Sequence, residues 1–190
     1  MKTLILCDRQ SMVFFTQDLG ALVREAVEDT GNKTTVITLN GDELSPCLGC
    51  FQCWVKTPGL CIITNDSANS IVAQLIQADV VILLSEIFYG GFSYDIKALL
   101  DRSISLISPY FETYEGEMHH KKRYEHFPVL IAIGYGGHMP EEYKTFKELA
   151  YRNALNLRPT KYFTFTIQDQ NDVGKTMQML HAVLTEEVQK

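Results

Sequence analysis

Four of the five cysteines stand close together in the chain, and their type and spacing make them strong candidates for chemistry. They fall in a Cys-rich loop, residues 45–64, as Cys47, Cys50, Cys53 and Cys61. Short Cys-x-x-Cys steps let several thiolates converge on one centre, and Gly49 and Gly59 give the backbone room to curl. In a reducing cytosol such clustering favours metal or redox chemistry over a disulfide framework. From the residues alone, a tetrahedral zinc site and a set of free reduced thiols both stay open.

Two stretches rich in glycine and aromatic residues are the next candidates. The apolar run 79–84 is followed by Ser85-Glu86-Ile87-Phe88-Tyr89-Gly90-Gly91-Phe92-Ser93, and the run 129–133 is followed by Gly134-Tyr135-Gly136-Gly137-His138. Glycines permit positive φ and close approach of the backbone to a flat ligand, and aromatic faces can stack on a ring. The alternative is that these aromatics only pack on the sheet beneath them.

The elements that must position these loops follow from an alternation of short apolar runs and helical patterns. Strands are predicted at 3–7, 36–39, 79–84, 129–133 and 162–167, and helices between them carry apolar stripes at 19–27, 71–76, 96–104, 146–157 and 173–184. This pattern predicts one domain, residues 1–190, with an α/β fold: a three-layer, doubly wound sheet of five parallel strands in the order 2-1-3-4-5. Its ligand crevice would lie at the carboxyl ends of strands one, three and four, which brings together loops 7–16, 85–93 and 134–140.

Taken together, these stretches resemble the NAD(P)H-dependent FMN reductases and iron-sulfur flavoproteins of the flavodoxin-like superfamily. The resemblance rests on residues 46–54, 57–61, 85–91 with 97–102, and 134–137. It implies a flavodoxin-like fold and an FMN-dependent oxidoreductase, with NAD(P)H as electron donor and a small molecule or a protein as acceptor. The flavin would carry the chemistry, so no catalytic side chain is expected.

The same resemblance implies a set of site residues. The FMN phosphate would lie near Arg9, Ser11 and Thr16. The flavin ring would lie along Ser85, Ile87, Phe88, Tyr89, Gly90 and Gly91, with its other edge at Gly134, Tyr135, Gly136 and Gly137. A 4Fe-4S cluster would be held by Cys47, Cys50, Cys53 and Cys61, whereas Cys7 on the first strand is expected to be a small core residue.

The chain departs from the family pattern at two places that matter for FMN. In the family the first loop usually reads Gly-Ser-Pro-Arg followed by hydroxyl residues, whereas here Asp8 adds a negative charge and Val13-Phe14-Phe15 adds apolar bulk. Glu86 stands where the family often has proline. These departures support two rival hypotheses: a non-catalytic flavodoxin-like electron carrier or binding module with a degenerate phosphate loop, and a metal-binding protein whose Cys-rich loop is structural.

Composition and charge limit the partners. A net charge of −6 and a pI near 5.3 argue against nucleic-acid binding, and no stretch approaches the roughly 20 apolar residues that span a bilayer. A cytoplasmic protein is expected. Residues 107–127 show no clear period and combine aromatics, the pair His119-His120 and the basic run 121–123. We expect this segment to be an insertion close to the crevice that makes an aromatic contact in a homodimer or tetramer.

Overall fold

The central sheet has the predicted strands in the predicted order. The computed structural model describes residues 1–14 and 17–188. Its main sheet joins five parallel strands in the order β2-β1-β3-β7-β8: Lys33–Thr38, Lys2–Cys7, Val80–Phe88, Val129–Tyr135 and Tyr162–Ile167. β1, β3 and β7 are the runs of Val, Ile and Leu that a sheet covered on both faces requires. The prediction of a doubly wound α/β fold is therefore confirmed.

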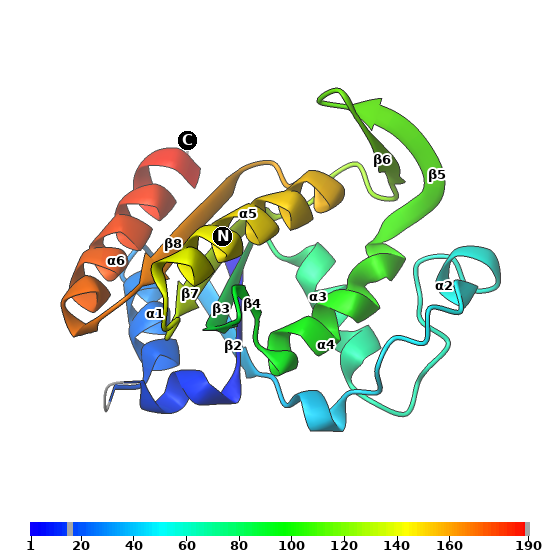
Figure 1. Ribbon diagram of the computed structural model, residues 1–190. Coiled ribbons are helices and arrows are strands. Elements are labelled where there is room, and N and C mark those ends of the chain that lie inside the picture. The colour runs from blue at the N-terminus through cyan, green and yellow to red at the C-terminus, as the bar shows by residue number, and fades with distance from the viewer. Residues whose placement is uncertain (15–16, 189–190) are drawn as a thin grey trace.

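Helices cover both faces of this sheet (Figure 1). On one face α1 (Leu19–Glu28) and α6 (Gln170–Ala182) form a hydrophobic core with the side chains of β1, β3 and β7 that point to that face. On the other face lie α3 (Ala68–Gln77), α4 (Tyr94–Arg102) and α5 (Pro140–Leu157). Short pieces complete the chain: η1 (Arg9–Val13), η2 (Gly41–Glu43), α2 (Gln52–Val55), η3 (Ser103–Leu106) and η4 (Val183–Val188).

Two of the crevice loops begin later than the sequence indicated. β3 continues through Phe88 and β7 through Tyr135, because Ser85 pairs with Gly134 and Glu86 with Tyr135 in the same parallel ladder. The chain then turns at Tyr89 and Gly90, and β4 (Gly91–Phe92) pairs back on the end of β3. Residues 85–88 and 134–135, which were expected in loops, thus form the carboxyl ends of β3 and β7, where the ladder hydrogen bonds hold them in place.

Within the predicted insertion, residues 107–122 form an antiparallel hairpin, β5 (Ile107–Tyr114) with β6 (Glu117–Lys122). Its tip packs on the C-terminal end of α5, where His119 bonds Asn156 at 3.0 Å and Arg152 pairs with Glu117 at 2.9 Å. α5 begins at the crevice loop and its 18 residues span about 27 Å, so this end of the helix is remote from the crevice. The expected position beside the crevice is wrong for the hairpin tip, as Figure 1 shows.

The two histidines of this hairpin serve packing. His119 is buried between Asn156 and Glu117, and the His120 ring lies 4.4 Å from Phe111 and 4.8 Å from Trp54 between centroids. Among the described residues, no helix has the length and apolar content needed to cross a membrane.

Candidate functional site

The crevice at the carboxyl ends of β1, β3 and β7 centres on Asp8. Asp8 follows β1 directly and is completely buried. Its carboxylate accepts hydrogen bonds from the Glu86 backbone N–H at 2.6 Å, from the Ser11 backbone N–H at 3.1 Å and from the Tyr135 hydroxyl. One side chain thus joins all three loops that the fold brings to this edge.

The two departures from the family pattern meet in this contact. Asp8 supplies the carboxylate and Glu86 supplies the backbone N–H that binds it. A proline at position 86 would have no N–H to donate. A residue other than proline at position 86 therefore supplies a hydrogen bond that stabilises the Asp8 carboxylate, and the two departures are coupled through this bond.

Burial sets the protonation of this cluster. It raises the pKa of Asp8, although hydrogen bonds from Tyr135, Glu86 and Ser11 oppose the shift. Burial and the charge of Asp8 raise the pKa of Glu86, and burial together with Asp8 raises the pKa of Tyr135 above its ordinary value. Burial likewise raises the pKa of Cys7 to about 12. Tyr135 is thus held as a hydrogen-bond donor, and Cys7 stays a thiol, as expected of a core residue.

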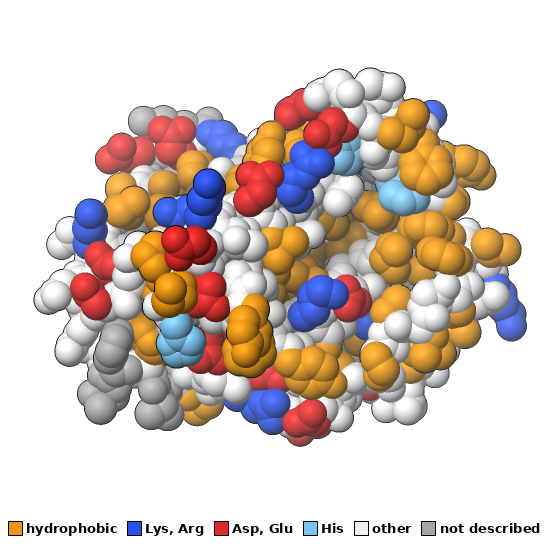
Figure 2. Space-filling view, in the orientation of Figure 1, with side chains coloured by type: hydrophobic (Ala, Val, Ile, Leu, Met, Phe, Trp, Pro, Cys, Tyr) orange, Lys and Arg blue, Asp and Glu red, His pale blue; other side chains and the backbone are white. Residues whose placement is uncertain are grey.

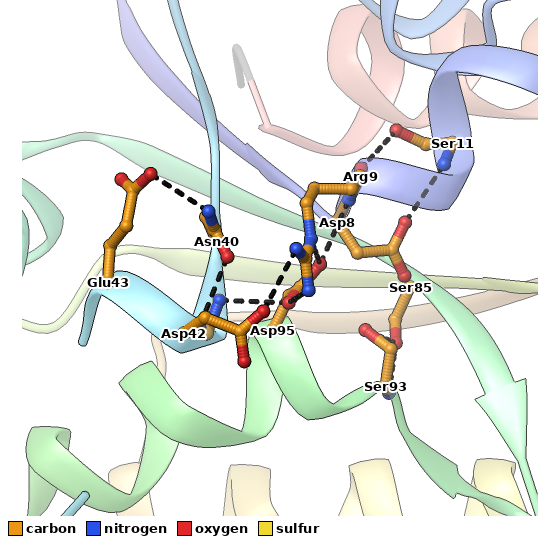
Figure 3. A network of polar contacts seen from close by, with 10 residues as sticks. Asp8, Arg9, Ser11, Asn40, Asp42, Glu43, Ser85, Ser93 and Asp95 are labelled. Atoms are coloured by element: carbon orange, nitrogen blue, oxygen red, sulfur yellow. Dashed lines mark hydrogen bonds and ion pairs between the residues drawn. The ribbon is translucent and has the colours of Figure 1, made fainter. Parts of the chain in front are cut away.

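Arg9 points away from the expected phosphate position. Its guanidinium forms an ion pair with the buried carboxylate of Asp95 at 2.9 Å and a second with Asp42 at 3.2 Å (Figure 3). Burial alone would raise the pKa of Asp95, but hydrogen bonds from Arg9 and from the Gly41 backbone N–H lower it below the ordinary value. Arg9 therefore connects the first loop to α4 and to the turn after β2, and its charge is already compensated.

Ser11, a second predicted phosphate ligand, also bonds within the protein. The Ser11 hydroxyl donates to the Asp8 carbonyl oxygen at 2.7 Å, and its backbone N–H binds the Asp8 carboxylate. Thr16 lies outside the described residues. Both donors of Ser11 are thus used by the protein itself.

The stretch expected to line the flavin ring divides into two groups. Ser85 and Ile87 are buried; the Ser85 hydroxyl accepts the Ser93 backbone N–H at 2.8 Å and braces the turn. Phe88 and Tyr89 are exposed and lie edge to face, with centroids 4.9 Å apart. Tyr89 has φ of 50°, an uncommon conformation for a residue with a side chain. The exposed pair is the aromatic surface that this edge offers to a ligand.

The glycines at and after the end of β7 leave space for neighbouring side chains. A Cβ at Gly134 would come within 2.5 Å of the Phe146 ring, and one at Gly137 within 3.1 Å of Tyr143, so both let aromatic side chains of α5 approach the strand. Gly136 has φ of 77° and faces Glu86. The sequence interpretation of these glycines as a ligand rim stays a prediction.

The four clustered cysteines line one pocket, together with Phe51, Ile63, Arg102 and Ile104. Cys47 and Cys50 are exposed, Cys53 is buried, and Cys61 is intermediate. Burial raises the pKa of Cys53, and the charges of Cys61, Cys47 and Cys50 raise it further. Gly49 and Phe51 both have positive φ, which curls the loop around the pocket. The convergence expected from the Cys-x-x-Cys spacing is therefore present.

Arg102, the last residue of α4, holds this loop from inside. It is buried and donates to the Ser45 carbonyl at 2.8 Å, the Ile63 carbonyl at 3.0 Å and the Asp66 carboxylate at 2.8 Å. Arg102 also lines the pocket of the cysteines, and its buried Nε has no hydrogen-bond partner among the described residues. A buried guanidinium N–H left unpaired is costly, so it points to a further acceptor.

The two metal hypotheses, a zinc ion and a 4Fe-4S cluster, require different arrangements of the four thiolates. Among the described residues no group of three or more Cys, His, Asp or Glu side chains is arranged to hold a single metal ion. Tetrahedral zinc requires four ligand atoms within about 2.3 Å of one ion. In a 4Fe-4S cluster each thiolate binds a different iron, which suits cysteines spread around a shared pocket.

Comparisons with known proteins agree with this architecture. No family model matches the chain. Over 85 residues it is 41% identical to an iron-sulfur flavoprotein of Methanocaldococcus jannaschii, a match that covers 43% of this chain and 42% of the relative. Over 88 residues it is 28% identical to the iron-sulfur flavoprotein of Methanosarcina thermophila, covering 46% and 44%. The chain thus spans less than half the length of the curated relatives it matches.

Solved structures extend the likeness to the whole chain. An NAD(P)H:quinone oxidoreductase from Methanothermobacter marburgensis superposes with a TM-score of 0.70 at 10% identity, covering 97% of this chain and 96% of that one. Flavodoxin 1 from Bacillus cereus superposes with a TM-score of 0.60 at 12% identity, covering 98% and 99%. The chain has a flavodoxin-like fold. The resemblance to iron-sulfur flavoproteins seen in the sequence is confirmed by the curated relatives.

Within this flavodoxin-like fold, sequence reasoning missed the polar residues that hold the site together. Asp66 and Asp95 are the buried partners of Arg102 and Arg9, and neither was expected to contribute. A signal exists for Arg102 and Asp95: both stand in α4, where a charged residue in the first turn and another in the last flank an apolar stripe. Their partners lie 36 and 86 residues away, beyond the reach of any local pattern.

Proposed function

We propose that this chain is a flavin-dependent electron-transfer oxidoreductase of the iron-sulfur flavoprotein type, with a 4Fe-4S cluster on Cys47, Cys50, Cys53 and Cys61. The observation that carries the proposal is the pocket shared by these four cysteines and by Arg102. The similarity to two iron-sulfur flavoproteins supports it independently.

The residues around the pocket fit such a cluster. Four thiolates supply its complete ligand set. The unpaired Nε–H of Arg102 is a donor suited to a cluster sulfur, and the positive guanidinium offsets negative charge in the pocket. Phe51 and Ile104 limit water from the sides. Trp54 covers the loop with its ring stacked on Phe51 at 5.0 Å, and its indole N–H donates to the Ile104 carbonyl at 3.0 Å.

The crevice residues fit the ring of a flavin better than its phosphate. The exposed rings of Phe88 and Tyr89 offer a stacking surface, and Gly90 and Gly136 keep the backbone beside it free of side chains. In the described part of the first loop, two expected phosphate ligands are occupied, since Asp8 takes the Ser11 N–H and Arg9 is paired. When bound, a flavin would supply hydride and single-electron chemistry. The chain's own contribution is to position the ring and to hold the cluster.

The finer assignments belong to the same proposal: FMN as the flavin, NAD(P)H as electron donor, and a small molecule or a protein as acceptor. None of the five cysteines forms a disulfide, which is consistent with the expectation of a reducing, cytoplasmic setting. The rival function, an electron carrier or binding module without turnover, is favoured by one observation, the placement of Asp8 in the first loop.

We further propose a homodimer or tetramer. Figure 2 shows apolar side chains gathered on the side of the molecule that carries the hairpin and the Cys-rich loop. Leu48, Val55, Tyr110, Phe111 and Met118 are exposed there, and such clusters usually mark interfaces. Light scattering coupled to size exclusion tests this directly: a monomeric mass at micromolar concentration would contradict it.

The test of the function is an anaerobic purification followed by an absorption spectrum, with iron and released flavin quantified on the same sample. We expect about four irons per chain and flavin bands. Cys50→Ser should abolish the iron signal, whereas Cys7→Ala, on the core strand, should retain it. Iron content that is unchanged in Cys50→Ser would refute the cluster. Loaded protein that fails to oxidise NADH or NADPH would favour the carrier.

A further inference from the structure

The first loop of the crevice carries a feature that bears on which flavin it binds. In doubly wound folds the backbone N–H groups that follow the first strand face the ligand crevice and suit a phosphate. In this chain the carboxylate of Asp8 occupies that environment. It takes the N–H of Ser11 from the first loop and the N–H of Glu86 from the end of β3.

The carboxylate is fixed in place from a third side. The hydroxyl of Tyr135, at the end of β7, also donates to Asp8, and the Tyr135 ring packs against Phe14 with centroids 4.8 Å apart. Asp8 and Tyr135 are both fully buried. Three donors on three separate strands or loops are the coordination that a bound anion would receive, and here a side chain of the protein receives it.

The charges around the loop also disfavour a second anion. The charge of Asp8 already raises the pKa of Glu86, and Asp18 adds a third carboxylate near Cys7. The nearby cation, Arg9, is neutralised by Asp95 and Asp42. A phosphate dianion entering at the Ser11 and Glu86 N–H groups would displace a buried carboxylate or stand beside it, and either arrangement is unfavourable.

We propose that Asp8 takes the place of a ligand phosphate in the first loop, so that the crevice binds a flavin through its ring and does not recognise a 5′-phosphate. The ligand class is then a flavin whose phosphate is absent or stays in solvent, and riboflavin binds as well as FMN. This inference rests on the proposed function, since it requires a flavin at the crevice. Asp8 is a specificity-determining residue in this account.

The experiment is a pair of fluorescence titrations with FMN and with riboflavin, made on the full chain and on matched variants. For the native chain we expect the two dissociation constants to agree within about threefold. Asp8→Ser frees the N–H groups of Ser11 and Glu86 and removes the charge, so FMN should bind at least about tenfold more tightly while riboflavin is unaffected. Inorganic phosphate should then compete with FMN in Asp8→Ser and not in the native chain.

Two further variants keep the test decisive. Asp8→Asn keeps an acceptor oxygen for Tyr135 and Ser11, removes the charge and replaces the oxygen that accepts the Glu86 N–H by an NH2 group. It serves if the serine variant does not fold, and it should raise FMN affinity by a smaller factor. Asp169→Ser is the control, because Asp169 also caps a helix at this edge, accepting the Asn171 N–H at 2.8 Å, but lies outside the Asp8 contacts; it should leave the FMN-to-riboflavin ratio unchanged.

The outcomes separate this inference from the function on which it rests. A native chain that prefers FMN to riboflavin by about tenfold or more overturns the inference and leaves the flavoprotein proposal standing. An FMN-to-riboflavin ratio that does not change in Asp8→Ser or Asp8→Asn also overturns it. If neither flavin binds the native chain or any variant, the flavin part of the proposed function fails, and the inference fails with it.

Discussion

The guanidinium of Arg102 connects both ends of the Cys-rich loop to α4, and its removal should destabilise the protein severely. The Arg102 and Asp66 side chains are 1% and 3% exposed, with nitrogen and oxygen 2.8 Å apart. Arg102→Ala leaves the Asp66 carboxylate buried without its partner, which costs about 3–5 kcal/mol. The free energy of unfolding of a domain is about 5–15 kcal/mol, so a large share of it would be lost.

Urea unfolding followed by circular dichroism measures this loss. With a slope of about 2 kcal/mol per molar, the midpoint for Arg102→Ala should fall by about 2 M. The matched control is Lys97→Ala in the same helix: Lys97 pairs with Asp101 one turn away, and both side chains are about half exposed. Such a surface pair is worth about 0.3–0.5 kcal/mol, or a shift of about 0.2 M.

Both variants should be compared in the Cys50→Ser background, so that loss of a cluster does not add to the difference. The reasoning is refuted if Arg102→Ala and Lys97→Ala shift the midpoint by the same small amount. That result would mean that water or a rearranged loop compensates Asp66, and that Arg102 does not hold the Cys-rich loop.

Three other predictions follow from named contacts. Burial tends to raise the pKa of Asp66, but hydrogen bonds from Arg102 and from two backbone N–H groups lower it overall, so its contribution to stability is complete above about pH 4 and is lost as pH falls through the folded pKa. Asp66→Asn should therefore flatten the dependence of urea midpoints on pH in that acidic range, and an unchanged slope would contradict the assignment. Tyr89→Asp should weaken flavin binding about two- to tenfold with no change in melting temperature, whereas Tyr110→Asp, at a position also exposed, on the hairpin, should leave affinity unaltered. Trp54 is the sole tryptophan and lies against the Cys-rich loop, so loading a cluster should quench its fluorescence and chelation of the iron should restore it; emission indifferent to iron would place the metal elsewhere.

Much of the site could be predicted from the chain, because some of its features are local. The spacing of Cys47, Cys50 and Cys53 forces their thiols into one neighbourhood whatever surrounds them, and the shared pocket follows. The role of Arg9 could not be predicted in the same way. An arginine after the first strand suits a phosphate, but its partner is set by Asp95, which stands 86 residues further on.

The sequence by itself determined the sheet, its strand order and the edge where the loops meet. Unbroken runs such as Val80 to Leu84 can only be buried on both faces, and amphipathic helices between them require right-handed crossovers. Only the tertiary structure decided what the crevice contains. Asp8 binds Glu86 and Tyr135 because the parallel register sets Glu86 beside Tyr135 and brings the end of β1 next to β3. Local pattern reports which residues are buried, but the partner of a buried charge depends on how distant strands align, and that alignment exists only in the folded chain.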